Sequence, residues 1–71
     1  MPTISPKKLL HSKWTRMHPQ NKEKHFIIVD VDYDDAGAVC ECVIEAVINR
    51  RRYHLDWREF NNRGTWQAGW F

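Results

Sequence analysis

Positively charged and tryptophan side chains near the two ends of the chain are the ones whose chemistry suggests a ligand. Lysine and arginine bind phosphate oxygens, and an exposed indole ring stacks on an unpaired base. The candidate nucleic-acid-binding residues are Lys7, Lys8, Lys13, Arg16, Arg50, Arg51, Arg52 and Trp70. They would share one face if the two ends of the chain meet in space. The alternative is a solvated surface that balances an acidic middle segment, and the sequence pI of about 8.7 favours it, since dedicated nucleic-acid-binding domains usually exceed about 9.

The acidic side chains could in principle support acid–base chemistry or bind a hard cation. Those on one face of a predicted hairpin are Asp30, Asp32, Glu41 and Glu45. An exposed sheet face without an oxygen-rich loop favours solubility or internal ion pairing instead. The four histidines lack the spacing of a metal site, and the serines lack a neighbouring base for nucleophilic catalysis. We therefore predict no catalytic residue, no metal site, no cofactor and no enzymatic activity.

Two cysteines, Cys40 and Cys42, lie two residues apart in a predicted strand and so should face the same way. Their Cα atoms would be about 6.5–7 Å apart, at the limit of disulfide geometry. We predict two reduced, buried thiols in a reducing compartment. The sequence has neither an apolar run of the ~20 residues that span a bilayer nor an apolar N-terminus typical of a signal peptide. The expected location is the cytoplasm, with no membrane partner.

Charge is segregated along a chain of 71 residues, which is long enough for one small domain. The first 29 residues carry six Lys/Arg and one Glu, for a charge of +5. Residues 30–48 carry six acids and no Lys/Arg, for −6, and residues 49–71 carry five Arg and two acids, for +3. A core this thin needs large side chains, and four tryptophans can supply much of it.

Two runs of alternating residues, Lys24–Tyr33 and Ala38–Ile48, predict an antiparallel hairpin. The apolar sides of these runs are Ile27, Val29, Val31 and Tyr33, and Ala38, Cys40, Cys42, Ile44, Ala46 and Ile48. Residues 34–37 supply the turn. A four-residue loop would place Val29 opposite Cys42, and a two-residue loop would keep the same faces.

Weaker signals predict the flanking elements. We expect a loose tail over residues 1–5 and one domain over residues 6–71, which opens with at most one short helical turn. We also expect a short strand within residues 12–17, a turn over 18–22, a third strand after the hairpin over 52–57 and a turn over 61–64. We expect Trp14, Trp57 and Trp66 in the core, whereas Trp70 suits either the core or a stacking surface.

Several separate motifs occur in an order that is similar to a known family. These motifs are Pro6-Lys7-Lys8-Leu9-Leu10, Ser12-Lys13-Trp14-Thr15, Lys24-His25-Phe26, Glu45-Ala46-Val47, Trp57-Arg58-Glu59-Phe60 and Trp66 with Gly69-Trp70. The chain resembles, from Pro6 to Trp70, a family of small bacterial Trp-rich conserved hypothetical proteins. The resemblance implies a stand-alone bacterial domain and no particular activity, so no functional residue is carried over. Phe60 stands where the resemblance leads us to expect leucine.

The predicted fold is mainly β: a small antiparallel sheet of three to five strands, curled or closed into a partial SH3-like barrel. The alternative is a flat meander whose open face is covered by a second copy. The predicted function is a non-enzymatic module that binds RNA or single-stranded DNA. A protein-interaction or homodimerising module is the alternative, because Phe26, Ile28, Val39 and Val43 are expected on the face that carries the acids.

Overall fold

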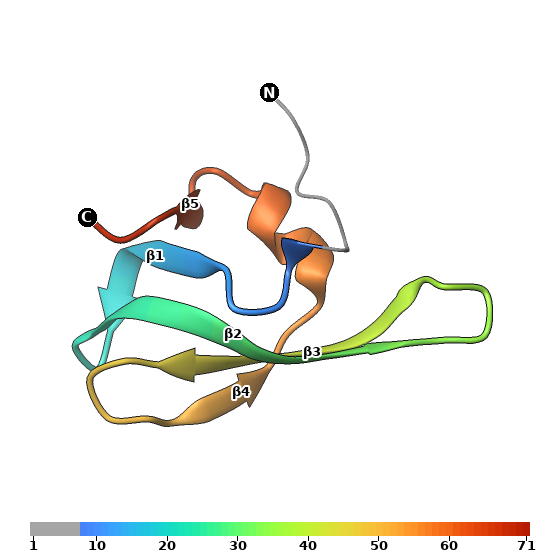
Figure 1. Ribbon diagram of the computed structural model, residues 1–71. Coiled ribbons are helices and arrows are strands. Elements are labelled where there is room, and N and C mark those ends of the chain that lie inside the picture. The colour runs from blue at the N-terminus through green and yellow to red at the C-terminus, as the bar shows by residue number, and fades with distance from the viewer. Residues whose placement is uncertain (1–7) are drawn as a thin grey trace.

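Five strands form one antiparallel sheet in the computed structural model, which describes residues 8–71 (Figure 1). They are β1 (Lys13–Gln20), β2 (Glu23–Tyr33), β3 (Val39–Ala46), β4 (Arg52–His54) and β5 (Trp66–Ala68), with a 3-10 helix, η2 (Trp57–Asn61), before the last. The strand order is β4-β3-β2-β1-β5. The mainly β prediction is confirmed. The predicted tail over 1–5, the domain start at residue 6 and Lys7 lie outside the described residues.

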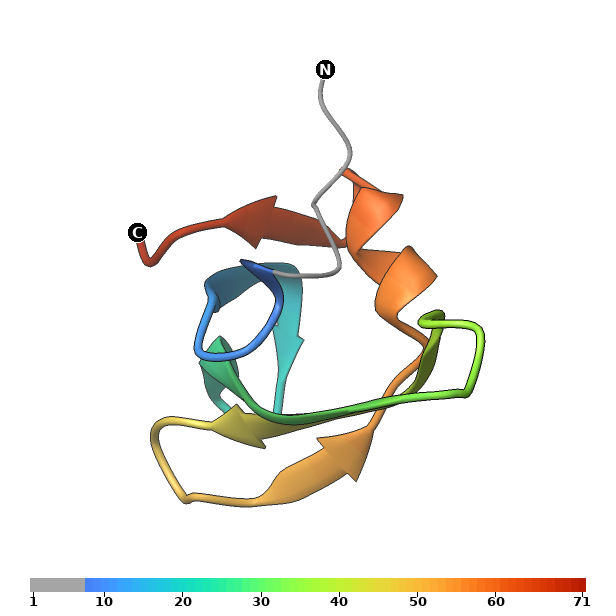
Figure 2. The same ribbon diagram turned by 45° about the vertical axis from the view of Figure 1, so that its right-hand side comes forward.

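The sheet is open and curled, and its two edge strands are joined by η2. The first four strands run as a meander, and η2 leads across the concave side to β5, which pairs with β1 at Trp14↔Ala68 and Arg16↔Trp66 (Figure 2). The chain therefore covers its own concave face, and the flat meander is not the observed arrangement. The predicted curled sheet is confirmed, while the resemblance to an SH3 barrel stays a prediction.

Aromatic rings fill the space between the concave face and η2. Phe60 of η2 stacks on Trp14 with ring centroids 4.4 Å apart and meets Trp66 edge-on at 5.2 Å. Phe26 packs edge-on against the other side of Trp66, also at 5.2 Å. The buried hydrophobic residues are Leu9, Trp14, Phe26, Ile28, Cys42, Ile44, Ala46, Phe60 and Trp66. The predicted core positions of Trp14 and Trp66 are confirmed, and Trp57 packs against the core while partly exposed.

The register of the β2–β3 hairpin differs from the predicted one. Ile28 lies opposite Ile44, but Val31 lies opposite Cys42, so Val29 is an extra residue in β2. A bulge of this kind shifts the alternation by one. Phe26 and Ile28 therefore face the core before the bulge, and the predicted inward side of Ile27 and Val29 is wrong there. The expectation that Phe26 and Ile28 share the acidic face is wrong for the same reason.

A second bulge corrects the prediction for the cysteines. Asp32 pairs with Glu41 and Tyr33 pairs with Val39, which leaves Cys40 as the extra residue in β3. Cys40 is exposed and Cys42 is buried, so the two free thiols do not share one environment. Asp34 closes the hairpin, since its carboxylate accepts from the backbone N–H groups of Ala36 and Ala38, both at 2.9 Å.

Element ends also differ from the predicted ones. β1 continues through Pro19 to Gln20, because β5 pairs only as far as Arg16 and the last part of β1 lies at a free edge that tolerates proline. β4 stops at His54 rather than 57, since the Asp56 carboxylate accepts from the Arg58 N–H at 3.0 Å and starts η2. The sequence does not predict the 3-10 helix η2 near the C-terminus. The predicted N-terminal helical turn begins outside the described residues, and Lys8 is in 3-10 conformation.

Candidate functional site

The C-terminal residues fold back over the outer face of β1 and β2. The Thr15 hydroxyl donates to the Gly69 carbonyl at 2.6 Å and accepts from the Phe71 N–H at 3.3 Å. Gly69 has φ of 89°, a left-handed conformation that glycine adopts without strain. The Trp70 indole N–H then donates to the Phe26 carbonyl at 2.9 Å, so the ring is held against the sheet by its own hydrogen bond.

Trp70 lies among polar and charged groups and is 41% exposed. The Lys13 ammonium is 4.8 Å from the ring centroid, within the range of a cation–π contact. The His25 ring is 6.0 Å away, and its Nε2 hydrogen-bonds the Phe71 backbone oxygen at 2.7 Å. Phe71 is 65% exposed beside it. We call the set Lys13, His25, Trp70 and Phe71 the Trp70 surface.

Arg52 belongs to the same outer face but already has an acidic partner. Lys13 pairs with Ile27, Ile27 with Glu45, and Glu45 with Arg52, so these four residues form one row across four strands. The Arg52 Nε is 3.0 Å from a Glu45 carboxylate oxygen. Since Arg52 is well exposed and the pair lies at the surface, it can exchange this partner at small cost.

Arg16 and Arg51 converge instead on the carboxylate of Glu23, which is only 3% exposed. The Asn49 amide donates to Glu23 at 2.8 Å, and the Tyr53 hydroxyl lies 2.8 Å from both of its oxygens. These hydrogen bonds, Asn49 first, and the positive charges of Arg51 and Arg16 lower the pKa of Glu23 below its ordinary value of 4.5. The cluster joins the β1–β2 turn to the β3–β4 turn.

The predicted basic residues therefore do not form one continuous face. Lys13 and Trp70 are in contact, Arg52 is in the same row as Lys13, and Arg50 and Arg51 lie in or beside the β3–β4 turn. Arg16 packs over the Trp66 ring, 5.8 Å from its centroid. Lys8 is exposed in the N-terminal segment before β1, and nothing places it with the Trp70 surface.

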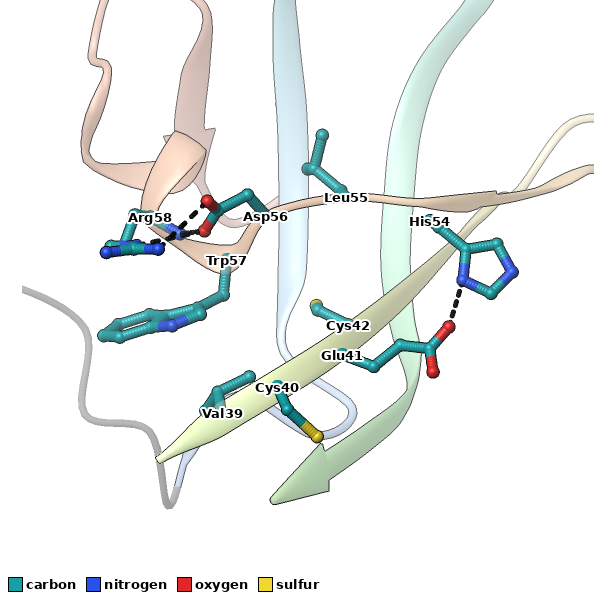
Figure 3. A pocket seen from close by; sticks show the side chains of 9 residues that line it. All are labelled: Val39, Cys40, Glu41, Cys42, His54, Leu55, Asp56, Trp57 and Arg58. Atoms are coloured by element: carbon teal, nitrogen blue, oxygen red, sulfur yellow. Dashed lines mark hydrogen bonds and ion pairs between the residues drawn. The ribbon is translucent and has the colours of Figure 1, made fainter. Parts of the chain in front are cut away.

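A groove of about 370 Å³ opens where β4 leaves the sheet, and the sequence does not predict it (Figure 3). It lies between β3 and the segment that leads into η2. Its lining residues are Val39, Cys40, Glu41, Cys42, His54, Leu55, Asp56, Trp57 and Arg58. Glu41 pairs with His54, and Asp56 pairs with Arg58 at 3.2 Å, on the two sides of the opening. Alternation patterns locate strands, but they carry no signal for the point at which two paired strands separate.

Cys42 is the buried thiol among the residues that line the groove. Burial raises the pKa of the Cys42 thiol to about 11, which disfavours the nucleophilic thiolate. Across residues 8–71, no three His, Cys, Asp or Glu side chains are grouped to hold a metal ion. In the same part of the chain, no helix is long and apolar enough to cross a membrane.

Most of the described chain matches a family model. The model is described as Tryptophan-rich protein (DUF2389), and it covers residues 12–70. The chain belongs to this family. The predicted resemblance to a Trp-rich family is confirmed, and the bacterial origin stays a prediction. No curated protein and no solved structure matched the chain.

The four tryptophans that characterise this DUF2389 member divide into two roles. Trp14 and Trp66 are buried, and Trp57 is half-buried at the groove, so these three belong to the core or its edge. Trp70 differs because it packs on the outer face and leaves much of its ring exposed. The Trp70 surface is therefore the part of the tryptophan set that a ligand can reach most easily.

Proposed function

We propose that this DUF2389 protein is a non-enzymatic binding module that holds RNA or single-stranded DNA at the Trp70 surface. The observation that carries the proposal is an indole ring fixed by a hydrogen bond to Phe26, partly exposed, with the Lys13 ammonium 4.8 Å from its centroid. A ring fixed in advance loses little conformational freedom when a base stacks on it. The adjacent ammonium can move from the ring to a phosphate oxygen.

Positive charge next to this surface supports the proposal. The His25 carbonyl accepts from the Val47 N–H at 2.9 Å, which places the Trp70 surface beside the β3–β4 turn that contains Arg50 and Arg51. The β1–β2 turn, with Lys22, lies at the same end of the sheet (Figure 1). We call these two turns, with Lys22, Arg50 and Arg51, the basic end. A strand of nucleic acid that stacks on Trp70 would have cationic side chains along its backbone path.

Titration of labelled single-stranded RNA and DNA oligonucleotides, followed by fluorescence anisotropy over a range of salt concentrations, tests the proposal. We expect binding that weakens steeply as salt rises, because each neutralised phosphate releases counterions. Trp70→Ala should weaken binding by about 1–3 kcal/mol, the usual contribution of one stacked base. Tyr33→Ala is the matched control, since Tyr33 is an aromatic residue of similar exposure (46%) on the acidic hairpin.

Two conservative variants test the stacked ring and the phosphate contact separately. Trp70→Phe keeps an aromatic ring and loses the hydrogen bond to Phe26, so its affinity should lie between those of the natural protein and Trp70→Ala. Lys13→Gln should reduce the slope of log K against log salt by about 0.7, the value for one phosphate contact on a single strand. Absence of binding at low salt, or equal weakening by Trp70→Ala and Tyr33→Ala, would contradict the proposal.

A protein-interaction or homodimerising role is the second candidate. The reason expected from sequence holds only for Val43, which lies opposite Asp30 on the acidic face. Phe26 and Ile28 are buried, and Val39 packs against the core. A different observation favours the role: the β2–β3 hairpin projects beyond the rest of the sheet (Figure 1). We call its outer part, residues 30–42, the hairpin arm.

A further inference from the structure

One edge of β3 lacks a neighbouring strand beside the groove. Pairing with β4 ends at Val43↔His54, and the last bond runs from the Leu55 N–H to the Cys42 carbonyl at 2.9 Å. The chain then diverges toward η2, so within residues 8–71 no strand pairs with Val39–Glu41 on that side. An edge of this kind is a template for an added strand.

The groove beside this edge can accept apolar side chains from one face of an added strand. Val39, Leu55 and Trp57 pack against the core and also line the groove (Figure 3). The volume of about 370 Å³ is at the lower end of ligand pockets, and it suits one or two side chains rather than a large cofactor.

The opposite face of the edge is acidic. The hairpin arm contains Asp30, Asp32, Asp34, Asp35 and Glu41, and it has no Lys or Arg. Because Cys40 is a bulge, Val39 faces the core side and Glu41 the outer side, where Asp30 and Asp32 also lie. A strand added here would place successive side chains alternately beside Val39, Leu55 and Trp57 in the groove and beside these carboxylates.

A second copy of the chain is a poor occupant of this edge. Its cationic groups at the basic end lie in and beside turns, which are not extended segments. A one-way contact between the basic end of one molecule and the arm of the next is also heterologous, so it would build a ring or a filament of several copies.

We infer that the β3 edge at Val39–Glu41 binds an extended segment of another protein in which apolar and basic residues alternate. The segment adds as a strand, with its apolar side chains in the groove and its basic side chains against the arm. The inference names a partner for the second candidate function. It does not depend on nucleic-acid binding, which uses the opposite end of the sheet.

A short labelled peptide in which valine alternates with lysine is the probe. Binding is measured by anisotropy and by the amide shifts of the isotopically labelled protein. We expect the largest shifts at Val39–Glu41 and at the Trp57 indole. A peptide with glutamate in place of lysine should not bind detectably. A peptide with proline at alternate positions should bind at least about tenfold more weakly, because proline cannot donate ladder hydrogen bonds.

Glu41→Lys should weaken binding of the Val/Lys peptide by about fivefold or more, since it reverses the charge at the rim of the groove. Glu59→Lys is the matched control, because it makes the same charge change at an exposed residue outside the groove. Loss of oligonucleotide binding in the Trp70 variants with normal peptide binding would separate the failure of one proposal from that of the other.

Three results would overturn the inference: no binding of the Val/Lys peptide, equal binding of the proline peptide, or shifts confined to the basic end. Concentration-dependent self-association of the unliganded protein, with shifts at Val39–Glu41, would assign the edge to a second copy instead. An oligonucleotide that produced the same shifts would assign it to nucleic acid.

Discussion

Glu23 is a carboxylate with almost no access to solvent, at the point where the β1–β2 and β3–β4 turns meet. Neighbours satisfy both of its oxygens, and two arginines add positive charge nearby. No partner of this kind could be inferred from sequence, because Asn49 and Tyr53 are distant in the chain and neither is part of a motif. The residue anchors the turn that positions Arg50 and Arg51.

Lowering the pH should reduce the stability of the folded protein, because Glu23 becomes protonated. Its pKa is lowered in the folded state, so its contribution to stability is present above pH 4.5 and is lost as the pH falls through the lower folded value. Glu23→Gln should lower the urea midpoint at neutral pH, and the difference from the natural protein should shrink below about pH 4. Glu59→Gln, which leaves the Glu23 contacts intact, is the control. A difference that stays constant with pH would contradict this assignment.

The two cysteines should react very differently with a thiol reagent. Cys40 is exposed, whereas Cys42 is buried and its pKa is raised to about 11. We expect one thiol to be modified rapidly in the native protein and the second only after unfolding in urea. Cys40→Ser should abolish the rapid phase. Rapid modification of both thiols in the folded protein would place Cys42 outside the core.

At the scale of elements, the hairpin was predictable and its register was not. The run Phe26-Ile27-Ile28-Val29 is apolar throughout, so it carries no alternation that could show which residues face inward. Asp30 and Asp32 indicate the outer side only for the part of β2 after Val29. Extending their alternation backward across the bulge assigns the wrong side to the first half of the strand, and the same error at Cys40 makes both thiols look buried.

The short helix η2 should be as important to stability as a strand, because Phe60 closes the core between Trp14 and Trp66. Phe60→Ala should cost about 3–5 kcal/mol, the usual range for a buried Phe, which is most of the stability of a small domain. Phe60→Leu should cost less than about 1.5 kcal/mol, because it keeps most of the buried volume. Urea unfolding followed by tryptophan fluorescence measures both. Similar midpoints for the natural protein and Phe60→Ala would show that η2 does not hold the core together.

At the scale of the whole molecule, charge segregation along the chain becomes segregation in space. Antiparallel pairing puts the β1–β2 and β3–β4 turns at one end of the sheet and the β2–β3 turn at the other (Figure 1). The first two turns carry Lys22, Arg50 and Arg51, and the arm carries five acids. The three charge blocks can be read from the sequence, but their positions at opposite ends of the sheet depend on the strand topology. The candidate binding residues illustrate the limit, since among those in residues 8–71 Lys13 alone has a recorded contact with the Trp70 ring.

The molecule measures 37 × 27 × 15 Å, with opposite charges at the two ends of the β2–β3 hairpin. Such a body has a permanent dipole moment, and the field of a polyanion turns it before contact so that its cationic turns lead. The acidic arm then points away from the polyanion and stays free in solution. Taken together, the two proposals predict an adaptor: one molecule oriented by nucleic acid would recruit a basic protein segment at its far end.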